Sequence, residues 1–503
     1  MARNLVSYCQ QKGFVYGPEP EIYGGMAGFY TYGPTGTLLK RRVEEVIRKT
    51  LQQAHFFEVE CPTVLPAAVW QASGHLGNFT DPVIKDIKGT AHRVDKLIEE
   101  HYQKHNITTH VPTDYAQLLE VLLHHKITAP DGTALVPDIK AQNLMMRTTI
   151  GLDTEAYNRP ETATATYLPF LRYLEFFRKQ LPFGVFQIGK AYRNEISPRQ
   201  FLLRMREFTQ AEAQLFIHPE DKKIYEAFEL IKSEELPFWN WEAQHAEQAV
   251  TAITVNEALG KGYFGTQAYG WSIRLAYTLF RNMGIPAQRL RLRQHAPDEK
   301  AFYAADAWDV EIDMPSYGWT EVCGVHDRTN YDLTQHAKAS KTELLAFDEQ
   351  RKEKFVPHVV EIAFGVDRPV FAILDMFYEE KDEGEGKTTF SVPYHLAPIQ
   401  VAVLPLMKKL DAEGELLFQE LSKDFVCTYD VSGSIGRRYL RNAEIGTPYC
   451  VTVDFEIREN GTVTIRDRDS EQQVRVHKDA VSETLRQLYR GTPFTHFVQA
   501  HSQ

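Results

Sequence analysis

Arginines and carboxylates recur between residues 185 and 216 at the spacing of two facing strands. If Val185–Glu195 is a strand, its period of two places Arg193 and Glu195 on the same face. A second strand over Leu203–Phe216 places four more side chains on a common face: Arg204, Arg206, Phe208 and Glu212. The turn-like residues 196–202 join the strands, so the sequence predicts a hairpin with one chemically active face.

The chemistry that suits this hairpin is nucleotide binding. A guanidinium offers a planar fork of donors for phosphate oxygens, and a phenylalanine ring offers a stacking surface for a base. The Glu195 carboxylate can accept a hydrogen bond from an exocyclic amine, which favours adenine. A surface hairpin with cross-strand Arg/Glu pairs is the alternative that these residues alone leave open.

A second group of candidates lies in Val359–Leu374, where an apolar strand contains Glu361 and ends at Gly365. A helix should follow, with Asp367 as its N-cap. Arg368 would then lie at a helix start, where anions are favoured, and would provide another phosphate contact. A capped, buried helix with a snorkelling arginine is the alternative.

The third group consists of the carboxylates of Trp308–Arg328, namely Asp309, Glu311, Asp313 and Glu321. Oxygen ligands of this kind suit Mg²⁺, which usually shares its coordination with substrate phosphates. Acids on a solvent-facing edge strand are the alternative. His326 is weighed as a base and left unassigned, because a lone histidine is more often structural.

The chain that must position these groups has 503 residues, too many for a single hydrophobic core, so we expect at least two domains. The charged, glycine-containing segment Lys381–Lys387 predicts a boundary between domains 1–390 and 391–503. Short strands interleaved with helices, without a GxGxxG or P-loop motif, favour an α+β fold with an antiparallel sheet before the boundary. Strands and helices alternate after it, which predicts a small α/β domain. Residues 84–140 and 218–295 are expected to be helix-rich insertions.

Composition limits the classes of partner. A net charge of −11 argues against a protein that coats nucleic acid nonspecifically, and we expect no DNA partner. No apolar run reaches bilayer length and no secretory leader is evident, so we expect a cytoplasmic protein without membrane contact. A second, organellar pool stays open. The five cysteines form no CxxC pair, and we expect reduced thiols.

An apolar stripe with Leu39, Val43 and Ile47 follows a glycine-rich segment near the start of the chain. It predicts a helix. The helix would serve either as a dimer contact or as an ordinary amphipathic surface helix.

Tyr192-Arg193-Asn194-Glu195, followed by Arg204, Phe208 and Glu212, resembles the hairpin motif of class II aminoacyl-tRNA synthetases. Within that class the chain resembles the glycyl-tRNA synthetases of the homodimeric type. Six ordered segments carry the resemblance: GGMAGFYTYGPTGTLLKRR at 24–42, WQASGHLGNFTDP at 70–82, RPET at 159–162, YRNEISPRQFLLRMREFTQAE at 192–212, YGWTEVCGVHDRTNYDL at 317–333 and GSIGRRYLRNAEIG at 433–446.

The resemblance implies an antiparallel catalytic core flanked by helices, a C-terminal anticodon-binding domain, a homodimer, and ATP, Mg²⁺, glycine and tRNA(Gly) as ligands. Arg193 and Arg368 would be the catalytic groups, and Glu321 with Glu311 would bind the metal. The implied ATP site is Arg193, Asn194, Glu195, Leu203, Arg204, Met205, Arg206, Glu207, Phe208, Glu321, Val322, Gly365, Val366, Asp367 and Arg368. The implied glycine site is Arg93, Glu161, Phe208, Thr209, Gln210, Ala211, Glu212, Glu361, Ile362, Ala363, Phe364 and Gly365.

Three segments depart from the family pattern, all near the amino-acid side of the site. The family's RPETAQG is RPETATA at 159–165, its EPSxG is EIAFG at 361–365, and its AExE is AEAQ at 211–214. Ala363 therefore lacks a hydroxyl that the family offers to the substrate, and Gln214 lacks a charge.

In the C-terminal domain the resemblance implies that Arg437, Arg438 and Arg441 contact tRNA, with Tyr439 and Tyr449 as weaker stacking candidates. Two other functions stay open. One is a noncatalytic relative, such as the accessory subunit of mitochondrial DNA polymerase, which serves as a nucleic-acid-binding partner. The other is a synthetase for a different small amino acid.

Overall fold

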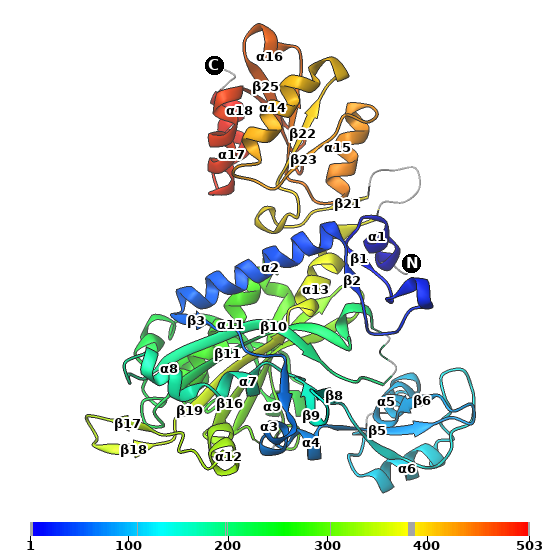
Figure 1. The fold of residues 1–503 in the computed structure, drawn as a ribbon, viewed down its shortest axis with the longest axis vertical. Helices are drawn as coiled ribbons and strands as arrows, with labels where there is room; N and C mark the ends of the chain where they lie inside the picture. Colours follow the sequence, from blue (N-terminus) through cyan, green and yellow to red (C-terminus); the bar gives the residue numbers. More distant parts are fainter. Residues whose placement is uncertain are drawn as a thin grey trace.

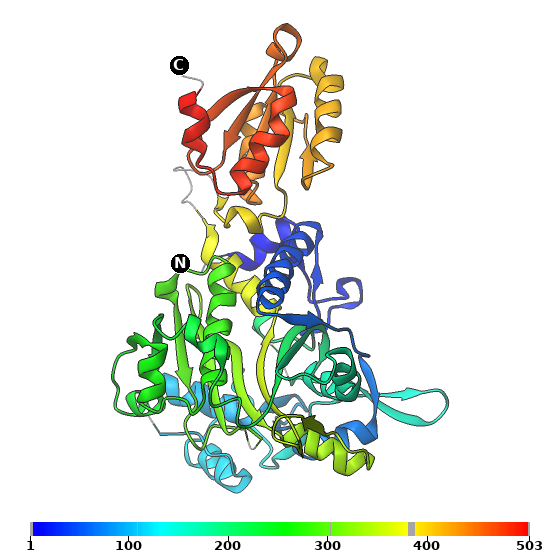
Figure 2. The same ribbon diagram turned by 90° about the vertical axis from the view of Figure 1, so that its left-hand side faces the viewer.

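The computed structural model describes residues 4–107, 109–196, 198, 200–301, 303–380 and 388–500. Residues before 380 form a large lower body, and residues after 400 form a smaller upper domain (Figure 1). Figure 2, turned by 90°, shows the same division, with α1 (Leu5–Gln11) and α2 (Pro34–Gln53) below the junction. The predicted linker Lys381–Lys387 lies outside the described residues.

A nine-stranded sheet organises the lower body. In spatial order its strands are β13 (Thr251–Thr254), β12 (Glu235–Trp239), β14 (Leu290–Gln294), β15 (Asp306–Met314), β16 (Gly318–Thr329), β19 (His358–Gly365), β11 (Glu207–Ile217), β10 (Phe183–Tyr192) and β3 (Phe56–Glu58). Neighbours are antiparallel except for the pairs β10/β3 and β12/β14. The predicted antiparallel core is confirmed.

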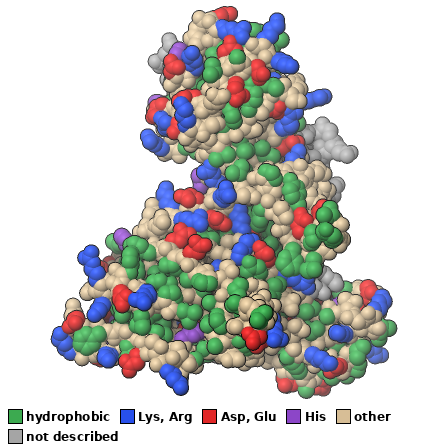
Figure 3. Space-filling view, viewed as in Figure 1, with side chains coloured by type: hydrophobic (Ala, Val, Ile, Leu, Met, Phe, Trp, Pro, Cys, Tyr) green, Lys and Arg blue, Asp and Glu red, His purple; other side chains and the backbone are tan. Residues whose placement is uncertain are grey.

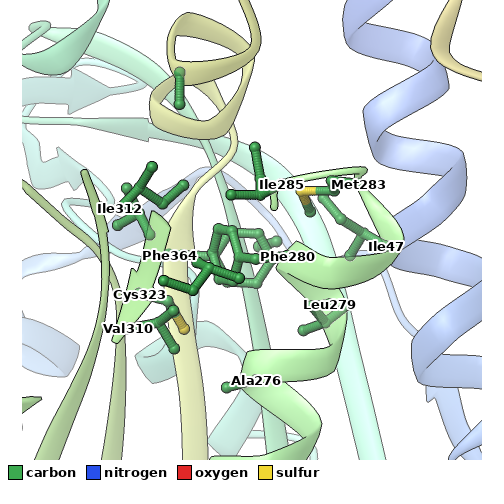
Figure 4. Packing of buried hydrophobic residues seen from close by; sticks show 14 of the residues in the cluster. Ile47, Ala276, Leu279, Phe280, Met283, Ile285, Val310, Ile312, Cys323 and Phe364 are labelled. Atoms are coloured by element: carbon green, nitrogen blue, oxygen red, sulfur yellow. The ribbon is translucent and has the colours of Figure 1, made fainter. Parts of the chain in front are cut away.

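Three helices cover one face of this sheet: α2, α11 (Gln267–Asn282) and α13 (Asp367–Phe377). Figure 4 shows Phe280 of α11 beside Phe364 of β19, and their ring centroids lie 5.6 Å apart. Ile47 of α2 points into the same cluster. The apolar stripe of α2 is therefore covered by the chain's own core, so it is not a bare surface for a dimer.

Smaller elements complete the lower body. They are β1 (Val15–Tyr16), β2 (Thr31–Tyr32), β4 (Val64–Pro66), α3 (Ala67–Ala72), α4 (His75–Asn78), β8 (Met146–Ile150), β9 (Thr154–Asn158), α7 (Ala163–Tyr167), α8 (Phe170–Phe176), α12 (Tyr331–Ser340), β17 (Ala346–Asp348), β18 (Glu353–Phe355), β20 (Tyr378–Glu379) and β21 (Thr389–Phe390). Helix α7 packs beside β10 and β11 and so brings the RPET segment to the sheet.

The two expected insertions have different outcomes. Residues 80–143 form a compact module of β5 (Thr80–Lys85), β6 (Ala91–Arg93), α5 (Val94–His105), α6 (Tyr115–His124) and β7 (Lys140–Asn143), with a core of its own. The second expected insertion, 218–295, is wrong as an insertion. It contributes β12, β13 and β14 to the main sheet and α11 to its core, besides α9 (Trp241–His245) and α10 (Val255–Gly260).

The upper domain contains a five-stranded sheet in the order β23 (Cys427–Tyr429), β22 (Val401–Pro405), β24 (Tyr449–Val453), β25 (Thr462–Asp467) and β26 (Gln473–His477). The first three strands are parallel and the last two antiparallel. Its helices are α14 (Asp411–Leu421), α15 (Ile435–Glu444), α16 (Glu456–Glu459), α17 (Val481–Tyr489) and α18 (Phe494–Ala500). A separate apolar cluster fills it, as the predicted small α/β domain requires.

In the described part of the chain, no helix has the length and apolar character to cross a bilayer.

Candidate active site

A cavity of about 240 Å³ opens on the face of the sheet opposite α11. One half is lined by residues predicted to bind ATP, among them Arg193, Glu195, Leu203, Arg204, Met205, Phe208, Glu321, Val322, Asp367 and Arg368. The other half is lined by Glu161, Gln210, Glu212, Tyr303, His326, Arg328, Glu361, Ala363, Phe364 and Gly365. Segments up to about 200 residues apart in the sequence thus meet in one site.

Arg193 is held at the centre of the cavity between two aromatic rings. Its guanidinium carbon lies 5.4 Å from the ring centroid of Phe208 and 5.4 Å from that of Phe79. Its Nε donates to the Pro160 carbonyl at 3.1 Å. Strand β10 ends at Tyr192 and β11 begins at Glu207, so the predicted strand bounds are wrong here and the connection positions Arg193.

Glu195 and Arg204 bind each other, because Arg204 Nε donates to Glu195 Oε2 at 2.8 Å. Arg204 also lies 3.7 Å from Asp81, which forms an ion pair with Arg93 at 3.0 Å. Arg93 forms a second pair with Asp95 and does not line the cavity. The role of Arg93 in the glycine site stays a prediction; in the structure Asp81 connects Arg93 to the Glu195–Arg204 pair.

Helix α13 presents Arg368 to the cavity mouth. Arg368 Nη1 donates to the Glu321 carbonyl at 3.0 Å and lies 3.4 Å from the Glu321 carboxylate. Asp367 is not the N-cap, so that prediction is wrong. Its carboxylate instead accepts from the Thr209 amide at 2.7 Å and from the Tyr32 hydroxyl at 2.6 Å, and these bonds fix the helix start against β11.

The two predicted metal ligands, Glu311 on β15 and Glu321 on β16, are cross-strand partners in the main sheet. Glu321 and Asp309 line the cavity, and Asp309 Oδ2 lies 2.7 Å from His295 Nε2. Glu311 does not line it. Its carboxylate pairs with Arg291, whose guanidinium lies between the indole rings of Trp239 and Trp319 at 4.0 and 4.2 Å. In the structure Glu311 is paired with Arg291, and its part in metal binding stays a prediction.

The amino-acid half is built around Glu361 on β19. Its carboxylate accepts from the Tyr167 hydroxyl at 2.7 Å and from Arg328 Nη1 at 3.2 Å, and His326 Nδ1 lies 3.5 Å away. Arg328 is also paired with Asp332 at 2.7 Å. Burial would raise the pKa of Glu361, but the charges of Arg328 and His326 outweigh it and lower the pKa.

Glu212 and Glu161 complete a set of three carboxylates. Glu212 accepts from the Thr162 hydroxyl at 2.5 Å and from Gln210 Nε2 at 2.6 Å. Burial, together with the like charges of Glu361 and Glu161, raises the pKa of Glu212 well above its ordinary value. An ammonium group that enters this half of the cavity would therefore face the carboxyl groups of Glu161, Glu212 and Glu361.

Several residues predicted to bind ATP or glycine do not turn their side chains to the cavity. Thr209, Ala211 and Ile362 are buried, because alternation along β11 and β19 turns them to the face opposite the cavity, and Val366, just before α13, belongs to the apolar core. Arg206 donates to the carbonyls of Ala27 and Glu195 at 2.9 and 3.0 Å, and Glu207 pairs with Lys190 at 3.0 Å. Asn194 is likewise absent from the lining.

The cavity is also lined by side chains that the sequence analysis did not select: Leu202, His295, Tyr303 and Arg328. Arg328 follows His326 by two positions on β16, so alternation would have placed the two on one face. His295 comes directly after β14 and carries no comparable local pattern.

In the upper domain the predicted tRNA contacts differ in exposure. Arg437 and Arg441 are exposed, although Arg441 Nε lies 3.2 Å from the Asp430 carboxylate. Arg438 is only 2 % exposed and donates to the carbonyls of Pro405, Asp430 and Leu406. The prediction that Arg438 meets RNA is therefore wrong. Tyr449 is buried, which excludes it as a stacking surface.

Family models match two parts of the chain. Residues 150–263 match "tRNA synthetase class II core domain (G, H, P, S and T)", and residues 400–488 match "Anticodon binding domain". Among solved structures, the RNA binding domain of threonyl-tRNA synthetase from Cryptosporidium parvum superposes with a TM-score of 0.59 at 15 % identity. It covers 96 % of this chain and 98 % of that one, and supports the fold.

Curated relatives extend over nearly the whole chain. Glycine–tRNA ligase of Thermococcus sibiricus is 36 % identical over 97 % of this chain and 98 % of the relative. The Pyrococcus furiosus protein of that name is also 36 % identical, over 97 % and 99 %. The Methanocaldococcus jannaschii protein of that name is 35 % identical, over 96 % and 98 %.

The antiparallel sheet, the Arg193 hairpin and the core-domain match define a class II aminoacyl-tRNA synthetase. Within this class the chain belongs to the glycine–tRNA ligase family, as the full-length relatives show.

Proposed function

We propose that this protein activates glycine with ATP and transfers it to the 3′ end of tRNA(Gly). The observation that carries the proposal is the single cavity in which Arg193 and Arg368 face the buried carboxylates Glu161, Glu212 and Glu361. Cations suit the triphosphate and the carboxylates suit an ammonium group. A noncatalytic relative would have no need to keep both halves together.

In the first step the glycine carboxylate attacks the α-phosphorus in line, and pyrophosphate leaves. Arg193 lies between the two halves, where it can bind both the attacking carboxylate and the α-phosphate. Arg368 at the cavity mouth binds the outer phosphates. These groups act by positioning and by stabilising charge, and neither needs to exchange a proton.

Mg²⁺ supplies neutralisation of phosphate charge when it is bound. In the described part of the chain no group of three or more His, Cys, Asp or Glu side chains is arranged to hold a metal by itself. Magnesium sites that use substrate phosphates need only one or two carboxylates. Glu321, whose side chain is 55 % exposed at the cavity, fits that role, with Asp309 as a deeper partner.

In the second step a ribose hydroxyl at the tRNA 3′ end attacks the carbonyl of the adenylate, and AMP leaves. We assign residues 1–390 to catalysis and residues 391–503 to anticodon binding, in which Arg437 and Arg441 are the exposed arginines. On the face shown in Figure 3, Lys and Arg are interspersed with Asp and Glu. That mixture supports local contacts with RNA over broad electrostatic adhesion.

We further propose a cytoplasmic homodimer. The curated relatives support the assignment through family membership alone. Light scattering coupled to gel filtration measures the oligomer directly, and a mass of one chain, 57.8 kDa, would contradict it.

The test of the function is pyrophosphate exchange into ATP with glycine, alanine and serine supplied one at a time. Glycine alone should support exchange. Exchange with alanine or serine in preference to glycine would establish a synthetase for a different small amino acid. No exchange with any of the three amino acids, in a protein that still binds tRNA, would establish a noncatalytic relative.

A further inference from the structure

Both carboxylate oxygens of Glu161 are held by side chains that line no part of the cavity. Thr164 Oγ1, one turn further along α7, donates to Glu161 Oε1 at 2.7 Å. His75 Nε2 lies 3.3 Å from Glu161 Oε2. Thr164 is fully buried and the side chains of His75 and Glu161 are each 15 % exposed, so the carboxylate is fixed with no ligand present.

The His75 ring is itself fixed. Its Nδ1 lies 2.8 Å from Ser73 Oγ, and the ring makes edge-to-face contacts with Trp70 and Phe79 at centroid distances of 5.4 and 5.7 Å. These contacts aim the opposite ring edge, which carries Nε2, at Glu161. A hydrogen-bonded second layer of this kind determines the orientation of the group it holds.

The same short segment also supports Arg193, because Phe79 lies under its guanidinium at 5.4 Å. Residues 70–79 therefore touch both halves of the site: His75 contacts Glu161, and Phe79 contacts Arg193. A substitution that disturbs only the contact between His75 and Glu161 should therefore affect only the amino-acid half of the cavity.

Thr164 is one of the positions at which this chain departs from the family pattern, since RPETATA stands in place of RPETAQG. We propose that Thr164 and His75 are positioning residues that hold Glu161 toward the ammonium group of the amino acid. The inference rests on the proposed function and adds how this chain orients one carboxylate of that site. Neither residue touches the reacting atoms.

The charge state of Glu161 is consistent with this arrangement. Burial acts to raise the pKa of Glu161, but His75, Arg328 and the Thr164 hydroxyl outweigh it and lower the pKa below its ordinary value. The carboxylate is thus kept ionised for a cationic ligand.

The test compares T164V with T164S by pyrophosphate exchange. Valine keeps the shape of threonine and removes the hydroxyl, so T164V should raise the KM for glycine about fivefold, the effect of one hydrogen bond, with the KM for ATP unchanged. T164S retains the hydroxyl and should restore a KM for glycine close to that of the wild type. T166V is the control, because Thr166 is equally buried in α7 and its hydroxyl bonds to the Thr162 carbonyl and to Gln187, not to Glu161.

An unchanged KM for glycine in T164V overturns the inference, as does an equal rise in T166V or in the KM for ATP, which would indicate general loosening. If T164V fails to fold, His75→Phe provides the same comparison, since it keeps the ring contacts and removes the donor. A wild type silent with glycine would overturn the proposed function and this inference together. An active wild type with an unaffected T164V overturns the inference alone.

Discussion

The two halves of the cavity are built in opposite ways. In the amino-acid half, the Glu361 and Arg328 side chains are 3 % and 4 % exposed and bind each other. At the phosphate mouth, the Arg368 and Glu321 side chains are 37 % and 55 % exposed. The half for a small ligand is organised in advance by protein partners, whereas the half for a highly charged ligand leaves its charges accessible to water until phosphates arrive.

The difference has a physical basis. A buried charge is stable only if it is paired and hydrogen-bonded, so three carboxylates around a small pocket require Arg328, His326 and hydroxyl donors. Exposed arginines carry no such requirement. Mutations in the amino-acid half should therefore alter both binding and stability, and mutations at the mouth should alter catalysis with little effect on the fold.

The largest effect is expected at the point where the halves meet. Arg193→Ala should lower kcat for glycine-dependent pyrophosphate exchange by at least about 10²- to 10³-fold, because a preorganised group that stabilises transition-state charge is lost. Circular dichroism should show an unchanged fold. Unfolding of this variant would mean that Arg193 serves the structure.

Next in size is Glu361→Gln, which removes a charge from the closed half. The KM for glycine should rise about 10- to 100-fold, as expected for loss of one charge-assisted hydrogen bond of about 1.5–3 kcal/mol. The KM for ATP should stay within a factor of about two if the halves act separately, and steady-state exchange kinetics measure both constants. Parallel rises in the two constants would contradict the separation.

Glu212→Gln tests how the amino-acid half of the cavity contributes to the pH dependence of stability. The folded pKa of Glu212 is raised, so its contribution to stability is present below its unfolded pKa and is lost as pH rises through the folded value. Glutamine cannot ionise, so the Tm of the variant minus that of the wild type should increase from pH 5 to pH 8. Thermal unfolding at both pH values measures this, and a difference that falls with pH would contradict the assignment.

The smallest effects are expected in the upper domain, where Arg437 is exposed and Arg438 is buried. Arg437→Ala should raise the KM for tRNA a few-fold and reduce the slope of binding against salt concentration by about one, without a change in Tm. Arg438→Ala should instead lower Tm, since each carbonyl left unsatisfied costs about 1–3 kcal/mol. A variant of Arg438 with normal Tm and weakened tRNA binding would show that Arg438 contacts tRNA and does not serve the fold.

The sequence by itself determined the family and several elements of the catalytic core. The strand that contains Glu361 and ends at Gly365, and the helix with Arg368 that follows it, are found where the sequence predicted them. Local periodicity is sufficient for such elements because it reports which side of a strand or helix must be buried.

Only the tertiary structure decided which polar residues are free to bind ligands. Arg438 has the residue type of an RNA contact, but its guanidinium is buried and donates to three backbone carbonyls. Two of these carbonyls, those of Pro405 and Leu406, lie 33 and 32 positions away in the sequence, a separation that no local pattern records. Conversely, Thr164 and His75 become meaningful only because folding brings residues 89 apart in sequence to the two sides of Glu161.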